Sequence, residues 1–207
     1  MAKIPIAVLA SGRGSNFQAL IDGIKNGEVN AEIKVMITDN PSAVAIERAK
    51  KAGIKYEVVE RNKFENRESM DLRIREILDQ NKVELVVLAG YMRLLKAKEL
   101  FTNYKNKIIN IHPSLLPKYP GLDAQKQAFE AREKISGFTI HFVDEQLDHG
   151  PIIYQEKVDI GDCKTADEVA VKILTREHLA YKKIIDSFSR GRYEIDQGKV
   201  KFVPDKK

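Results

Sequence analysis

The chain has 207 residues, of which 43% are hydrophobic and 31% charged, a composition that excludes collagen-like, low-complexity and disordered classes. Its single cysteine, Cys163, excludes an intrachain disulfide and a cysteine-based zinc site, and favours a reducing, cytoplasmic location. The net charge of +5 is dispersed, and no apolar run approaches the ~18 residues of a membrane span, so we expect neither nucleic acid nor membrane as a partner.

Short apolar runs alternate with helical patterns through the first half of the chain. Apolar residues spaced three or four apart predict one-sided helices beginning near Phe17 and Met70, and Gly27 and Gly53 stand where helices should end. Uninterrupted apolar runs indicate strands that are covered on both faces, as in a parallel sheet. These runs lie at 6–9, 33–37, 56–59, 85–88 and 108–111. The first half therefore predicts the order β-α-β-α-β-α-β.

The second half has a different rhythm. Extended segments at 137–144 and 151–158 are joined by a turn-rich link, which is compatible with a hairpin or a mixed-sheet extension. Thr165 and Glu168 have capping-box spacing and open a long helix, and two short alternating pieces flank Gly198. No repeat, linker or domain boundary interrupts the chain. We expect a single Rossmann-like α/β domain over 1–207, with a mostly parallel twisted sheet, helices on both faces and a mixed or antiparallel C-terminal extension.

The loop after the first strand has the pattern of an anion site. Residues 11–16 read SGRGSN and lead directly into the helix from Phe17. In an open parallel sheet, ligands bind beyond the carboxyl ends of the strands. Gly12 and Gly14 allow close backbone approach, and the start of the helix aims free N–H groups at an anion. We therefore expect a phosphate to bind there.

Other guests of this loop stay open. A dinucleotide fingerprint would need a third glycine where Phe17 stands, and a P-loop would need Gly-Lys-Ser/Thr, which is absent. Asp39, after the second strand, could still bind a nicotinamide dinucleotide's ribose, and a plain glycine turn is the remaining alternative. The pattern favours a phosphomonoester over both.

The fifth predicted strand carries an amide and an imidazole to its carboxyl end. Asn110 and His112 lie on one face of the strand, and Pro113 keeps His112 away from helical dihedral angles. Such a pair suits a carbonyl that becomes an oxyanion, although both side chains could instead satisfy the turn before Pro113. Asp148 is a candidate partner for His112. Ser114 is rejected as a nucleophile, because the chain has no Gly-x-Ser-x-Gly elbow.

The remaining titratable residues are weaker candidates. Glu177 interrupts the apolar stripe of the long helix, so its carboxylate needs either a ligand or a structural ion pair. We expect His141 and His178 to be packed or rim residues and His149 to be a loop side chain. None of the histidines has the local spacing of a metal site, so no metal is expected.

Several segments, in order along nearly the whole chain, carry a family resemblance. They read ASGRGSN at 10–16, LAGYMRLL at 88–95, NIHPSLLPKYPG at 110–121, HFV at 141–143 and LDHGP at 147–151. Together they closely resemble the phosphoribosylglycinamide formyltransferase family. The resemblance implies transfer of a formyl group from the cosubstrate 10-formyltetrahydrofolate to the amine of 5'-phosphoribosylglycinamide in de novo purine biosynthesis, without a metal.

The resemblance also assigns roles to individual residues. It implies a phosphate-binding half at about 1–100, a catalytic and folate-binding half at about 100–190, and small-molecule substrates handled by a monomer or homodimer. The implied catalytic set is Asn110, His112 and Asp148. The implied acceptor site comprises Gly12, Gly14, Ser15, Asn16 and Glu177. The implied folate site comprises Arg67, Met92, Arg93, Leu94, Leu95 and Asn110.

The chain also departs from the family pattern. Many relatives carry histidines after Gly121, where this chain reads LDAQKQA, and His149 stands where a small residue is common. Two sibling activities share the catalytic set, namely a formyltetrahydrofolate deformylase and a methionyl-tRNA formyltransferase. These siblings carry an additional domain for which we expect no room in 207 residues.

Overall fold

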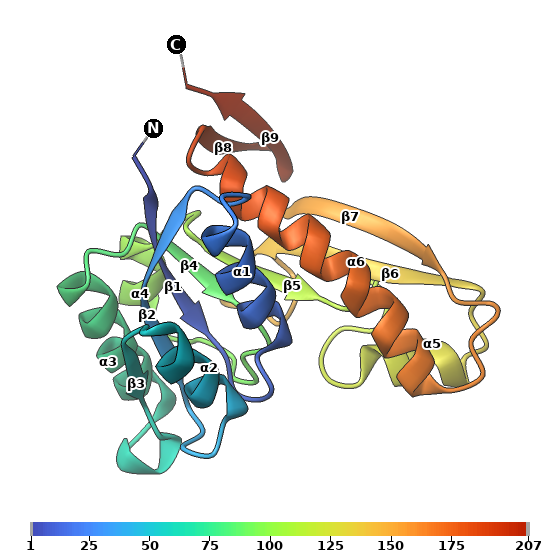
Figure 1. Ribbon diagram of the computed structural model, residues 1–207, viewed down its shortest axis with the longest axis horizontal. Coiled ribbons are helices and arrows are strands. Elements are labelled where there is room, and N and C mark those ends of the chain that lie inside the picture. The colour runs from blue at the N-terminus through green and yellow to red at the C-terminus, as the bar shows by residue number, and fades with distance from the viewer. Residues whose placement is uncertain (1, 206–207) are drawn as a thin grey trace.

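The computed structural model describes residues 2–205, so residues 1, 206 and 207 of the predicted domain lie outside the described part. A seven-stranded sheet has the order β3-β2-β1-β4-β5-β6-β7 (Figure 1). The first five strands are mutually parallel, and β6 and β7 add to the β5 edge antiparallel to their neighbours. The strands are β1 (Ile4–Leu9), β2 (Ala31–Thr38), β3 (Tyr56–Val58), β4 (Leu85–Leu88), β5 (Ile108–His112), β6 (Ile135–Phe142) and β7 (Ile152–Asp159). The predicted fold class is confirmed.

Helices cover both faces of this sheet. Alternate residues of β1 show the reason, because Ile6 and Val8 join the core beneath one set of helices while Ala7 and Leu9 join the opposite core. The first set is α1 (Ser15–Lys25), α2 (Val44–Ala52), α5 (Ala124–Glu130) and α6 (Ala166–Ser187), and the second is α3 (Arg67–Gln80) and α4 (Lys98–Asn103). In Figure 1, α6 runs diagonally across the front, beside α1.

Three short elements were not predicted. They are α4, α5 and the single 3₁₀ turn η1 (Arg61–Lys63). Each is too short to establish a helical period, and Leu100 is the one buried residue within α4. The first helix also begins at Ser15, two residues before the predicted Phe17, because Gly14 adopts a left-handed conformation at its N-cap.

The long helix α6 begins and packs largely as its sequence indicates. The Thr165 side chain accepts the backbone N–H of Glu168, while Glu168 accepts the N–H of Lys164 at 2.6 Å, one residue before the expected capping-box partner. Further along, the fully buried Tyr181 hydroxyl donates to the carbonyl of Leu88 at 2.8 Å and lies 3.2 Å from that of Ile109. Tyr181 therefore fixes α6 against β4 and β5.

The tail forms a separate two-stranded antiparallel sheet of β8 (Gly191–Asp196) and β9 (Lys199–Pro204). An aromatic cluster attaches it to the main body, with Tyr193 5.2 Å from Phe202, 4.8 Å from Phe188 and 6.2 Å from Phe142 between ring centroids. The alternating pattern around Gly198 thus corresponds to a real hairpin.

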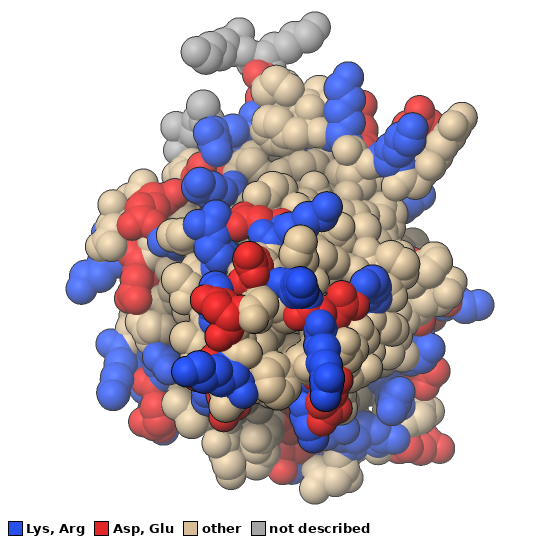
Figure 2. Space-filling view, turned by 90° about the vertical axis from the view of Figure 1, so that its right-hand side faces the viewer, with Lys and Arg blue, Asp and Glu red and all other residues tan. Residues whose placement is uncertain are grey.

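The surface and the helices bear on possible partners. On the face shown in Figure 2, lysine and arginine side chains are interspersed with aspartate and glutamate rather than gathered into a basic stripe. Within residues 2–205, none of the helices combines the length and the apolar character needed to cross a membrane.

Replacing Tyr181 by phenylalanine should destabilise the fold. The change removes a hydroxyl that serves two buried carbonyls, and we expect the free energy of unfolding to fall by about 1–3 kcal/mol. Urea denaturation with an unchanged m-value measures this loss. Tyr56→Phe on β3 is the matched control and should stay within ~0.5 kcal/mol of wild type. Equal stability of the two variants would contradict the role given to Tyr181.

Candidate active site

The strand order reverses between β1 and β4, and the loops after these two strands meet at that point. The Ser11 N–H donates to the Gly90 carbonyl at 3.0 Å, and the Ser11 hydroxyl accepts the N–H of Met92 at 2.8 Å. Such a switch point at the carboxyl edge is where open α/β sheets bind ligands. It brings the predicted anion loop and the predicted folate segment together.

The glycine loop has the geometry expected of an anion site at a helix N-terminus. Gly14 has φ +64°, and a Cβ there would lie 3.0 Å from the Cβ of Ala45, so both conformation and space require glycine. Gly12 is exposed, and a Cβ there would meet no protein atom within 4 Å. The first-turn N–H groups of α1 at 15–17 precede the first helical bond, which runs from Gln18 to the Gly14 carbonyl at 2.9 Å.

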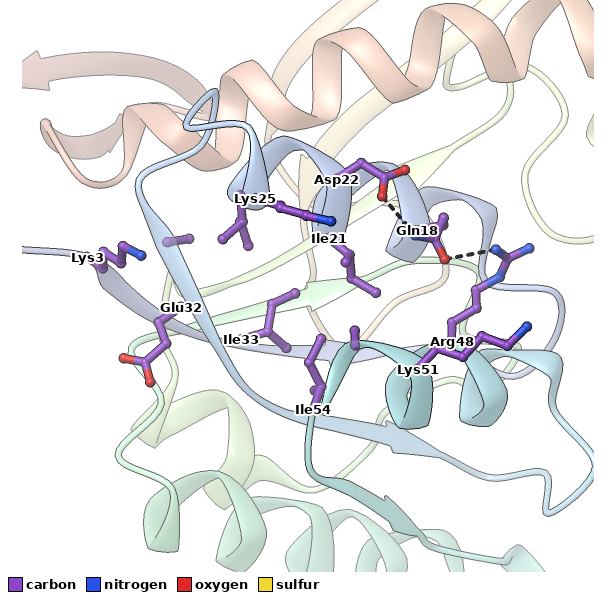
Figure 3. Close-up of a pocket in the computed structure, with 13 residues that line it drawn as sticks. Lys3, Gln18, Ile21, Asp22, Lys25, Glu32, Ile33, Arg48, Lys51 and Ile54 are labelled. Atoms are coloured by element: carbon purple, nitrogen blue, oxygen red, sulfur yellow. Dashed lines mark hydrogen bonds between the residues drawn. The ribbon is translucent and has the colours of Figure 1, made fainter.

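Arg48 of α2 supports this loop from the side. Its Nε donates to the Arg13 carbonyl at 2.8 Å and its guanidinium reaches the Gln18 amide oxygen at 3.0 Å (Figure 3). The residues drawn in this view line a groove between α1 and α2, with Ile33 among them. The groove has a volume of about 550 Å³. None of the predicted site residues lines this groove.

The three predicted catalytic side chains lie together. His112 Nδ1 is 3.4 Å from one carboxylate oxygen of Asp148, and Asn110 Nδ2 is 3.5 Å from the other. The side chains of His112 and Asp148 are only 6% and 8% exposed. Asn110 and His112 are two residues apart on β5, and the link after β6 brings Asp148 to them. The contact predicted between His112 and Asp148 is present.

Both ring nitrogens of His112 face acceptors. Nε2 is 2.8 Å from the main-chain carbonyl of Tyr119, which can only accept, so Nε2 carries a proton. Nδ1 faces Asp148. Burial lowers the pKa of His112, while Asp148 and the Tyr119 carbonyl oppose that effect by favouring the charged ring. Burial outweighs these two contacts, so the pKa of His112 is lowered and the ring releases its proton more readily than a free histidine.

His141 was expected to be a packed or rim histidine, and the structure places it in this cluster instead. It is 2% exposed and pairs with Asn110 across the antiparallel β5–β6 ladder. Its Nε2 lies 3.2 Å from Asn110 Nδ2 and 3.7 Å from Asp148. Its Nδ1 faces the Phe142 carbonyl at 2.8 Å. The missing signal was the strand register, which becomes apparent only once β6 is paired antiparallel to β5.

Asp148 is held by the loops on either side of it. One of its carboxylate oxygens accepts the N–H of Gly121 at 2.8 Å, and its own φ is +49°. Burial alone would raise the pKa of Asp148, but the contact with His141, the hydrogen bond from the Gly121 N–H and the nearby imidazole of His112 outweigh burial and lower it. The following Gly150 is required because a Cβ there would lie 1.8 Å from the Phe142 carbonyl oxygen.

Glu177 occupies the buried position that its place in the helix indicated. It is 4% exposed, and one of its oxygens accepts from the Asn16 side chain at 3.0 Å. Burial raises the pKa of Glu177 to about 7, against the lowering effect of the Asn16 bond. Within residues 2–205 it has no ion-pair partner, and Glu177 Oε1 and Asn16 Oδ1 are both buried without a hydrogen bond. The alternative of a structural ion pair is therefore wrong.

The predicted folate segment forms the other wall of the switch point. Met92 is 59% exposed, Leu94 is half-buried and Leu95 lies in the core. The buried carboxylate of Asp71 on α3 holds the end of this segment by accepting the N–H groups of Lys96 and Ala97. A cavity of about 580 Å³ adjoins the segment, and it is lined by residues including Ser11, Asp39, Arg61, Met92 and Arg93.

Two further predicted residues have distinct surroundings. Arg93 donates to one carboxylate oxygen of Asp39 at 2.6 Å, while the other oxygen is buried without a hydrogen bond to the described residues. Arg67 is exposed at the first position of α3, one turn before Asp71, and has no polar contact with the described residues. The described chain also has no cluster of three His, Cys, Asp or Glu residues suited to a metal.

The Glu177→Gln change should reveal the buried carboxyl through pH. The folded-state pKa of about 7 lies above the ordinary 4.5, so the wild type loses stability as pH rises from 4.5 through 7. At about 1.4 kcal/mol per pH unit, the variant should be more stable than wild type by about 3 kcal/mol at pH 8 and equal to it near pH 4.5. Urea denaturation across this range tests the trend. The surface variant Glu130→Gln should follow the wild-type curve, and a pH-independent gain for Glu177→Gln would contradict the explanation.

Comparison with known proteins places the chain in a family. A model of the formyl transferase family matches residues 4–185. Phosphoribosylglycinamide formyltransferase of Escherichia coli (strain K12) is 37% identical, covering 93% of this chain and 90% of that protein. The protein of the same description from Bacillus subtilis (strain 168) is 43% identical, covering 86% and 91%.

Solved structures agree with the sequence comparison. The crystal structure of glycinamide ribonucleotide transformylase 1 from Symbiobacterium toebii superposes with a TM-score of 0.93 at 40% identity, covering 97% of this chain and 94% of that one. The sequence match, the fold and the residues gathered at the switch point agree, and the chain belongs to the formyl transferase family, among its phosphoribosylglycinamide formyltransferases.

Proposed function

We propose that the protein transfers a formyl group from 10-formyltetrahydrofolate to the amine of 5'-phosphoribosylglycinamide, in the cytoplasm and in the de novo synthesis of purines. The observation that carries this proposal is the cluster of Asn110, His112 and Asp148 at the carboxyl edge of the sheet, in a member of this family. The cluster supplies the groups that acyl transfer requires at a developing oxyanion.

The acceptor binds at the glycine loop. Its phosphate takes the first-turn N–H groups of α1 at Ser15, Asn16 and Phe17, where the helix dipole favours an anion. Beside Asn16, Glu177 offers a buried oxygen that has no hydrogen bond within residues 2–205, which suits a polar group of the acceptor. Tyr181, one turn further along α6, lies against Ile109 and thus brings this end of the acceptor site close to Asn110.

The donor binds on the other side of the switch point. Met92 is exposed beside a cavity of about 580 Å³, a size that suits a small-molecule ligand. We assign the folate contacts to Met92, Arg93, Leu94 and the backbone around Leu95, because the Leu95 side chain is in the core. Arg67 is assigned to the same ligand as an exposed cation at the start of α3.

The reaction is a direct acyl transfer. The neutral amine of the acceptor attacks the formyl carbon, and the carbonyl electrons move to oxygen to form a tetrahedral oxyanion. Asn110 donates a hydrogen bond to that oxygen, and His112, held and electrostatically supported by Asp148, stabilises its charge and helps to move protons. The intermediate collapses as the C–N bond to tetrahydrofolate breaks, the amine loses a proton and the departing nitrogen gains one.

Formyl transfer is tested by following the folate absorbance with purified protein. We expect tetrahydrofolate to appear only when 10-formyltetrahydrofolate and 5'-phosphoribosylglycinamide are both present, because the amine is the nucleophile. Formate release at the same rate without acceptor would instead show a deformylase. Thermal stabilisation by NAD and none by folate would favour the dinucleotide alternative.

Removal of either oxyanion partner should affect turnover far more than folding. We expect Asn110→Ala and His112→Ala each to lower kcat by ~10²–10³, the usual effect of losing one such donor. Asp148→Asn should retain donor binding and lose most turnover, because it removes the charge that supports His112 with little change in volume. Thermal midpoints provide the folding control. A kcat within a few-fold of wild type for either alanine variant would refute its role.

A further inference from the structure

The loop at 113–123 contributes a main-chain group to the proposed catalytic cluster. The Tyr119 carbonyl lies 2.8 Å from His112 Nε2, and two residues later the Gly121 N–H donates to Asp148. One loop therefore touches both members of the imidazole–carboxylate pair. The position of the loop backbone therefore determines whether Nε2 of His112 has a hydrogen-bond acceptor.

Tyr119 is held in an unfavourable backbone conformation. Its φ is +54°, in the left-handed region that residues with a Cβ seldom adopt, so neighbouring contacts must maintain it. On one side of its Cα the carbonyl accepts from His112. On the other, the half-buried ring packs against the main core, and its hydroxyl donates to Glu133 at 3.0 Å.

Glu133 lies outside the loop, between α5 and β6. The carboxylate oxygen that accepts from the Tyr119 hydroxyl also lies 2.7 Å from Nζ of Lys118. The carboxylate therefore fixes two consecutive loop side chains at one point, and these two bonds lower the pKa of Glu133. Its side chain is 25% exposed, against 62% for Lys118, so the bond to tyrosine is the better shielded of the two.

We propose that Glu133 is a positioning residue, which fixes Tyr119 through its hydroxyl so that the Tyr119 carbonyl holds the imidazole of His112 in place. The consequence for turnover rests on the proposed function. The effect on His112 itself does not. The other groups that face this imidazole are Asp148 and His141, and neither depends on Glu133 for its contacts.

The test is a side-chain NMR titration of His112 in the whole chain. The protein has four histidines, and the signal of His112 is identified by its loss in His112→Gln. In Tyr119→Phe and in Glu133→Ala we expect the pKa of His112 to fall by about one unit, because the charged ring loses a well-placed acceptor. Tyr119→Phe retains the ring in the core, so a change in His112 reports the lost hydroxyl rather than lost packing.

Two comparisons separate anchoring from other effects of Glu133. Glu133→Gln keeps an acceptor for the tyrosine hydroxyl without the charge, so the pKa of His112 should return most of the way to its wild-type value. If the effect were purely electrostatic, the pKa of His112 would be the same in Glu133→Gln as in Glu133→Ala, and this result would overturn the proposal. The double variant Tyr119→Phe/Glu133→Ala should shift no further than Tyr119→Phe alone, whereas additive shifts would show that the two residues act independently.

The kinetic experiment uses the same variants. We expect kcat to fall about tenfold in Tyr119→Phe and Glu133→Ala, with the acceptor KM within about twofold of wild type, because the imidazole rather than the acceptor site is disturbed. Glu130→Ala, a surface carboxylate at the end of α5, is the matched control and should change neither kcat nor the titration. An unchanged titration of His112 in both Tyr119→Phe and Glu133→Ala overturns this proposal. Absence of formyl transfer by the wild type overturns the proposed function and leaves the titration as a valid test.

Discussion

The site depends on one buried carboxylate, that of Asp148. Its two oxygens contact Asn110 and His112 from β5, His141 from β6 and the backbone of Gly121. A buried anion is costly unless donors surround it. The need to satisfy this charge therefore fixes two strands and two loops relative to one another, and it gives the imidazole its partner.

A second buried carboxylate, that of Glu177, has a different character. Among the described residues it has one donor, Asn16, and no cation, and burial raises its pKa to about 7. A buried polar atom without a hydrogen bond lowers the stability of the folded protein. In the proposed acceptor site, the ligand would satisfy that atom. Its contact with Asn16 joins α6 to the start of α1, and Tyr181 joins the same helix to β5. The proposed acceptor site and the proposed catalytic cluster are thus both attached to α6.

Much of the fold was predictable from the sequence. The parallel strands are short, continuously apolar runs, and the main helices show a clear one-sided period, because burial in a layered α/β fold produces these patterns directly. The glycine loop and the pairing of Asn110 with His112 on one face were accessible for the same reason, since both depend on neighbouring residues. The short helices α4 and α5 were not predicted, because one or two turns are too few to establish a helical period of apolar residues.

The sequence by itself determined which residues each strand carries to the carboxyl edge and where an anion could meet a helix start. Only the tertiary structure decided that His141 belongs to the cluster, that Arg93 already binds Asp39, and that the Tyr119 carbonyl holds His112. These contacts join segments from 7 to 54 residues apart. They follow from strand register and loop closure, which depend on packing across the whole molecule and leave no local pattern in the chain.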